Sequence, residues 1–125
     1  MLNWSGLGEK RFETVVRSHE SEVSFNGDHF TAYAIRVNTL SEAELTSNAE
    51  RWTRGDRADA VLKEAVEFIS SAGHEAPWFP KSDQILTDKL YILMWLVELR
   101  PRVNAAQLII ARPSDRMIFY ASMRN

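Results

Sequence analysis

The chain contains no cysteine, and this absence excludes several classes of protein at once. Disulfide scaffolds, cysteine-ligated zinc, iron–sulfur clusters and thiol catalysis all require that residue. With 125 residues, 45% of them hydrophobic, the chain can bury a core without a disulfide or a metal. The sequence therefore predicts a single domain over residues 1–125, and we expect it in the reducing environment of the cytoplasm.

Long hydrophobic runs are missing as well. The longest run covers residues 90–97, whereas a membrane-spanning helix needs about 20 hydrophobic residues. The first residues have neither the basic start nor the apolar stretch of a secretory signal. No stretch rich in glycine, serine or proline divides the chain. We expect no membrane association and no export.

The sequence also lacks the motifs of common catalytic and metal sites. His-Glu-x-x-His, Gly-x-Ser-x-Gly and a glycine-rich phosphate loop are all absent. We therefore predict no metal, no cofactor and no catalytic residue. The alternative is a small enzyme in which His19, His29 or His74 lies in a concave pocket together with Arg36.

Segments rich in β-branched and aromatic residues predict strands near both ends of the chain. Asn26-Gly27, which lies between apolar residues, is typical of a tight hairpin turn. Segment 10–19 fits helical and β spacing almost equally, and we favour a strand. Pro113 suits a turn between the last two strands. The other expected strands cover residues 21–26, 28–37, 106–111 and 116–123.

Three helices are expected between these strands. Ser41 and Glu44 can form a capping box, and the helix that follows should end at Gly55. Asp56 is the expected N-cap of a second helix, which ends at Gly73.

The third helix is predicted over 82–99 from an apolar stripe at helical spacing. Leu86, Leu90 and Val97 lie on this stripe, and Pro101 ends the helix. Tyr91 and Trp95 remain at its outer edge.

Strands at both ends and helices between them favour an α+β fold. We expect an antiparallel sheet of four or five strands, formed by an N-terminal and a C-terminal hairpin and packed against three helices. Both faces of the C-terminal strands are apolar, as Leu108 and Ile109 illustrate. Either another part of the chain or a second chain must cover the face without helices, and a second copy would give a homodimer.

Charge is distributed unevenly along the chain. Residues 1–99 carry 10 basic and 16 acidic side chains, a net charge of −6, whereas residues 100–125 carry five arginines and one aspartate, a net charge of +4. Arg112 and Arg116 can contact phosphates or an acidic partner, or they can neutralise acidic groups of the same molecule. The isoelectric point is near 5.9. A nucleic-acid-binding domain usually has an isoelectric point above about 9. Nucleic-acid binding through this hairpin is therefore the second choice.

Aromatic residues complete the predicted partner-binding site. Trp78 and Phe79 lie in a stiff loop between two prolines, where they can anchor a partner or, for Trp78, fill the core. The most consistent function is a non-enzymatic protein-binding module, such as a stoichiometric inhibitor, an immunity or anti-defence protein, or an accessory subunit. The predicted contact residues are Trp78, Phe79, Tyr91, Trp95, Arg112 and Arg116.

Overall fold

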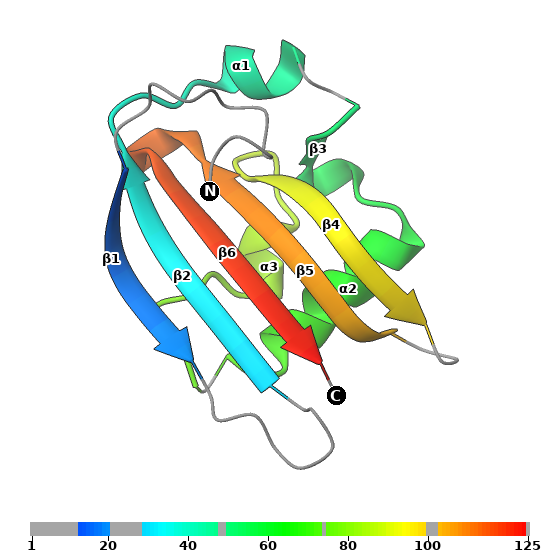
Figure 1. The fold of residues 1–125 in the computed structure, drawn as a ribbon. Coiled ribbons are helices and arrows are strands. Elements are labelled where there is room, and N and C mark those ends of the chain that lie inside the picture. The colour runs from blue at the N-terminus through cyan, green and yellow to red at the C-terminus, as the bar shows by residue number, and fades with distance from the viewer. Residues whose placement is uncertain (1–12, 21–28, 48–49, 74, 100–102, 125) are drawn as a thin grey trace.

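The computed structural model describes residues 13–20, 29–47, 50–73, 75–99 and 103–124. These residues form an α+β fold around an antiparallel six-stranded sheet with the order β1-β2-β6-β5-β4-β3 (Figure 1). The sequence predicted the class but only four or five strands. The strands are β1 (Glu13–Glu20), β2 (His29–Val37), β3 (Thr53–Arg54), β4 (Tyr91–Leu99), β5 (Val103–Arg112) and β6 (Met117–Arg124). The α-helices are α1 (Glu42–Ser47), α2 (Ala60–Ser70) and α3 (Ser82–Ile85).

Two antiparallel pairs of strands, one from each end of the chain, form the larger part of the sheet. β1 and β2 pair antiparallel, so the strand favoured near residues 10–19 is present. β5 and β6 are joined by a 3-10 turn at Pro113–Asp115, after which Arg116 adopts a left-handed conformation with φ 59°. The predicted pairing of strand 28–37 with residues 21–26 is wrong, because β2 lies between β1 and β6. Residues 21–26 and the Asn26-Gly27 turn themselves lie outside the described residues.

The predicted third helix is wrong over most of its length. Only the four residues Ser82–Ile85 are helical, and Tyr91–Leu99 form β4, which lies between β3 and β5. Leu90 and Ile92 pack into the cluster beneath α2, whereas Tyr91 and Leu93 pack into the cluster on the opposite face. Both faces are buried at the start of β4, over Tyr91–Leu93, and hydrophobic residues continue beyond it, so the sequence lacks the alternation that marks a half-buried strand.

The first two helices begin near their predicted positions and are shorter than expected. The amide of Glu44 donates to the Ser41 hydroxyl at 3.3 Å, which is one of the two bonds of the predicted capping box. α1 ends at Ser47, well before Gly55, and the Ser47 hydroxyl donates to the carbonyl of Glu44 at 2.8 Å. The N-cap of α2 is Asp59 rather than Asp56, since the Asp59 carboxylate accepts from the amide of Leu62 at 2.8 Å.

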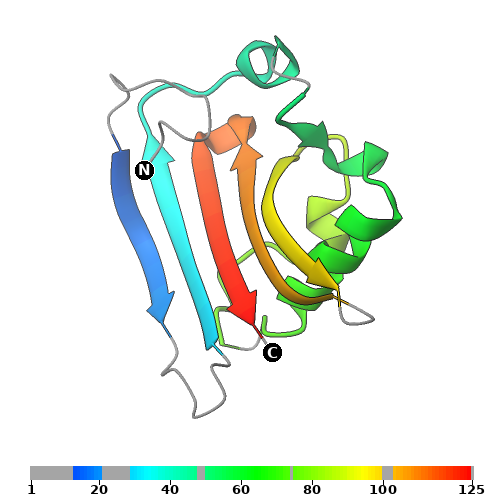
Figure 2. The same cartoon turned by 45° about the vertical axis from the view of Figure 1, so that its right-hand side comes forward.

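Helices cover the two faces of the sheet unequally. α2 lies against one face, where its buried side chains meet Leu108, Ile110 and Phe119 (Figure 2). On the other face α1 and the segment before β3 contribute Leu45 and Trp52 to a second cluster at one end of the sheet. Ile109 and Ile118 are 2% and 1% exposed. These two side chains are therefore covered within the chain, whereas Tyr33 and Tyr120 on the same face are only partly buried.

No helix within the described residues is long and apolar enough to cross a membrane.

Candidate protein-binding surface

The outer edge of β4 is paired over only a small part of its length. β3 has two residues, and they pair with Tyr91 and Ile92. Within the described residues, the edge from Leu93 to Leu99 therefore has no neighbouring strand on its outer side. Such an edge presents backbone N–H and C=O groups that another strand can pair with.

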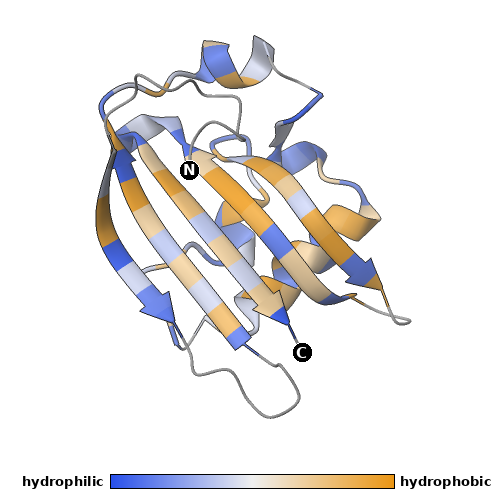
Figure 3. Ribbon diagram, in the orientation of Figure 1, coloured by the Kyte–Doolittle hydropathy of each residue, from blue (hydrophilic) through white to orange (hydrophobic). Residues whose placement is uncertain are grey.

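Exposed hydrophobic side chains are concentrated on the same stretch. Met94 is 36% exposed, Trp95 54%, Leu96 37% and Leu99 47%, and they are four of the seven large hydrophobic residues found exposed in the described ranges. The register shifts between Met94 and Leu96, which leaves Trp95 as an extra, bulged residue. Figure 3 shows β4 as a largely hydrophobic strand at one side of the sheet. We call Met94, Trp95, Leu96 and Leu99 the β4 edge patch.

A polar pair borders this patch. The Arg124 guanidinium donates to both Glu98 carboxylate oxygens, at 3.0 and 3.2 Å. Hydrogen bonding to Glu98 raises the pKa of Arg124 above its usual value. The pair gives the apolar patch a charged boundary on the face away from α2.

The predicted contact residues do not lie together on one surface of the structure. Trp95 belongs to the β4 edge patch. Phe79 is 5% exposed and its ring lies 5.7 Å from that of Phe119, so it is a core residue without a contact surface. Trp78 is half-buried against the core cluster that contains Phe79 and Phe119. Its burial is therefore intermediate between that of a core plug and that of an exposed anchor, the two expected alternatives. Arg116 is exposed and donates to the carbonyl of Asn38 at 3.4 Å.

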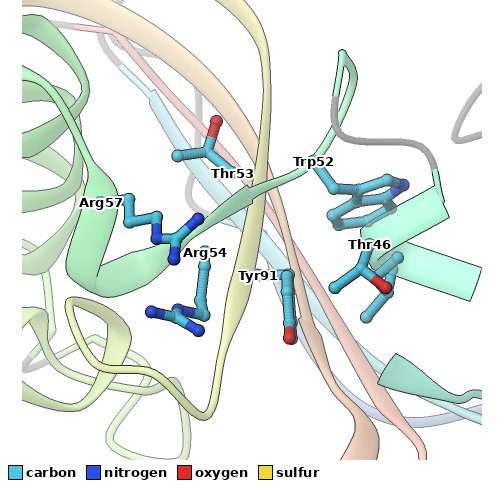
Figure 4. Close-up of a pocket in the computed structure, with 7 residues that line it drawn as sticks. Thr46, Trp52, Thr53, Arg54, Arg57 and Tyr91 are labelled. Atoms are coloured by element: carbon cyan, nitrogen blue, oxygen red, sulfur yellow. The ribbon is translucent and has the colours of Figure 1, made fainter. Parts of the chain in front are cut away.

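Tyr91 lines a pocket of about 260 Å³ between α1 and β4, shown in Figure 4. Leu45 and Trp52 form its apolar wall. Arg54 also lines it, but its guanidinium is held by both carboxylate oxygens of Asp56 at 2.5 and 2.9 Å. This hydrogen bonding lowers the pKa of Asp56. Burial raises the pKa of Tyr91 above its ordinary value of 10.0.

A second pocket brings two of the predicted residues together. It has a volume of about 310 Å³ and includes Trp78 and Arg112, with Arg17 and Arg36 beside them. The sequence did not single out Arg17, because its strand was uncertain and no motif marks it. Arg112 lies over the Phe119 ring, 4.9 Å from its centroid, and donates to both carboxylate oxygens of Asp115.

The described histidines do not form the pocket that the enzyme alternative needs. His19 lies 3.3 Å from a Glu75 carboxylate oxygen, and its ring centroid is 5.5 Å from that of Phe30. His29 is 3.3 Å from the Ser122 hydroxyl. Neither lines the pocket that contains Arg36, and His74 lies outside the described residues. The described part of the chain also holds no group of three or more potential ligands placed around a metal ion.

Comparisons with known proteins give no assignment: no family profile, no curated protein and no solved structure matches the chain.

Proposed function

We propose that this chain is a non-enzymatic protein-binding module that binds its partner at the outer edge of β4. The observation that carries the proposal is the coincidence of exposed hydrophobic side chains with an edge that has no described neighbouring strand. A stoichiometric inhibitor, an immunity or anti-defence protein, or an accessory subunit would use such a surface to bind one target.

The chemistry of the edge favours strand addition. A partner strand would bond to the β4 backbone, and its side chains would pack against Met94, Trp95, Leu96 and Leu99. Tryptophan and methionine are enriched at protein interfaces, where aromatic residues often dominate the binding energy. A long apolar edge in contact with water promotes aggregation, so its occupation by a partner also protects the protein.

The electrostatics favour a protein partner over nucleic acid. Two arginines of the C-terminal hairpin, Arg112 and Arg124, form ion pairs with Asp115 and Glu98. These pairs partly neutralise both guanidinium groups and so weaken their attraction for a phosphate backbone. Segment 42–75 contains eight acidic and four basic side chains, which favours a target with a basic surface through long-range attraction.

Affinity capture with matched variants tests the proposal. Leu96→Lys adds a charge to the β4 edge patch, whereas Val61→Lys adds the same charge on α2 at a residue of nearly equal exposure, 38% against 37%. We expect wild type and V61K to retain the same protein from the cells of origin, and L96K to lose it while melting near the wild-type temperature. Equal retention by L96K and wild type would contradict the proposal.

Light scattering separates a foreign partner from a second copy. The proposal predicts that the purified wild-type chain is a monomer of 14.3 kDa. A wild-type dimer that L96K converts to a monomer would instead make the edge a homodimer interface.

A further inference from the structure

The second pocket, which contains Arg17, Arg36 and Arg112, lies on the face of the sheet that packs against α2. The pairing of four neighbouring strands brings its residues together. In one row, Ile110, Phe119, Ala34 and Arg17 are successive partners across β5, β6, β2 and β1. In the adjacent row, Arg112, Met117, Arg36 and Thr14 follow in the same way. Ala34 has a small side chain, whereas its partners Phe119 and Arg17 have large ones, and this difference leaves a hollow over Ala34. The hollow over Ala34 is bordered by Arg17, Arg36, Arg112 and Trp78.

The charge of this hollow is strongly unbalanced. Three arginines and one carboxylate, that of Asp115, line it, a net charge of +2. Asp115 is bonded to Arg112 at 2.9 and 2.8 Å. Within the described residues, neither Arg17 nor Arg36 forms an ion pair, although the charge of Arg36 acts on nearby Asp115. Gathering three arginines around a single carboxylate costs free energy, which an anionic ligand would recover.

We propose that the hollow over Ala34 is a binding site for a small phosphate monoester. Arg17 and Arg36 supply guanidinium donors that match phosphate oxygens in geometry, and Arg112 is held in place by Asp115 and the Phe119 ring. The organic group of the ligand lies against Trp78 and Val16, two of the apolar side chains that line the hollow.

The arrangement favours one compact dianion over other anions. A phosphate monoester carries a charge near −2 above its second pKa of about 6, which balances the net charge of the lining. A carboxylate carries half that charge. A nucleic-acid backbone is bound by basic residues that follow a groove, whereas these arginines come from three strands and surround one hollow. The site is separate from the β4 edge patch, since β1 and β2 lie at the other side of the sheet.

Calorimetric titration at low ionic strength tests this site with phenyl phosphate as the probe. We expect a Kd of about 1 mM or tighter near pH 7.5. The affinity should fall below about pH 6, where the probe becomes a monoanion. Benzoate, which has the same ring and one negative charge, should bind at least about tenfold more weakly. Inorganic phosphate should bind, but more weakly than phenyl phosphate, because it makes no contact with Trp78.

Matched arginine variants locate the binding. Arg36→Gln should weaken phenyl phosphate binding by about tenfold or more, since a charge-assisted contact is lost. Arg116→Gln removes the same charge from the same end of the molecule, but Arg116 does not line the hollow, and we expect less than about a twofold change. Three results would each overturn the proposal: no binding of phenyl phosphate at about 10 mM, equal losses in R36Q and R116Q, or tight binding of a single-stranded oligonucleotide without binding of phenyl phosphate.

Discussion

Glu98 of β4 and Arg124 of β6 form an ion pair that spans the strand between them. Both are register partners of Ala105 on β5, and the small alanine side chain lets the two long ones meet above it at 3.0 Å. The pair therefore connects the end of the edge strand to the centre of the sheet.

Loss of this connection should loosen the end of β4 in a salt-dependent way. We expect Arg124→Gln to lower the melting temperature slightly in low salt, and the difference from wild type to shrink in about 1 M salt, because partly exposed ion pairs are screened. Thermal melts followed by circular dichroism at the two salt concentrations measure this. An equal loss at both concentrations would mean that Arg124 acts through packing rather than charge.

Gly55 is the position in the described chain where an added methyl group should do most harm. Its amide donates to the carbonyl of Leu90 at 2.8 Å. A Cβ built there would overlap the carbonyl oxygen of Ile85 and lie 2.7 Å from that of Thr87. Gly55→Ala must therefore displace backbone between α3 and β4, and we expect a loss of about 2–3 kcal/mol in urea unfolding. A change below about 0.5 kcal/mol would show that this contact is looser than described.

Trp78 and Phe79 should differ in their contribution to stability. Phe79 is buried against Phe119, so Phe79→Ala should cost about 3–5 kcal/mol. Trp78 is half-buried, and Trp78→Ala should cost roughly half as much, about 1.5–2.5 kcal/mol. Chemical denaturation of both variants gives the comparison. If W78A lost more unfolding free energy than F79A, Trp78 rather than Phe79 would be the more deeply packed residue.

Asp115 should contribute to stability in a pH-dependent manner. Hydrogen bonding from Arg112, with a smaller effect of nearby Arg36, lowers the pKa of Asp115 below its ordinary value of 3.8. Its contribution to stability is complete above that value and is lost as the pH falls through the lowered pKa of the folded state. The loss of stability of Asp115→Asn relative to wild type should therefore be greatest near neutral pH and shrink in acid. Melting temperatures between about pH 7 and about pH 2 test this, and a constant difference would refute it.

The sequence predicted the parts of the fold that local chemistry determines. The N-cap bond at Ser41, the apolar stripe of α2 and the Pro113 turn each act over a few residues, and each appears at or near its expected place. Residues 90–97 were misread because an apolar run of eight residues has no clear period. Only the tertiary structure shows that α2 and α1 cover opposite faces at the start of this strand.

The candidate surfaces were harder to predict for the same reason. Trp95 was singled out as an aromatic residue of a helix, and it lies on the strand edge instead. The hollow over Ala34 depends on the register between β1 and β2, which places Arg17 opposite Ala34. No local pattern encodes that pairing. Trp78 and Arg112 were identified by residue type, but their proximity became visible only in the folded chain.

Amide hydrogen exchange of the complex tests the central claim most directly. If a partner strand adds to the outer edge of β4, peptides that cover Leu93–Leu99 should exchange more slowly in the presence of the captured partner, because their outward amides become hydrogen-bonded. Peptides from α2 that contain Val61 should exchange at an unchanged rate. Unchanged exchange over Leu93–Leu99, together with protection of another surface, would contradict the account.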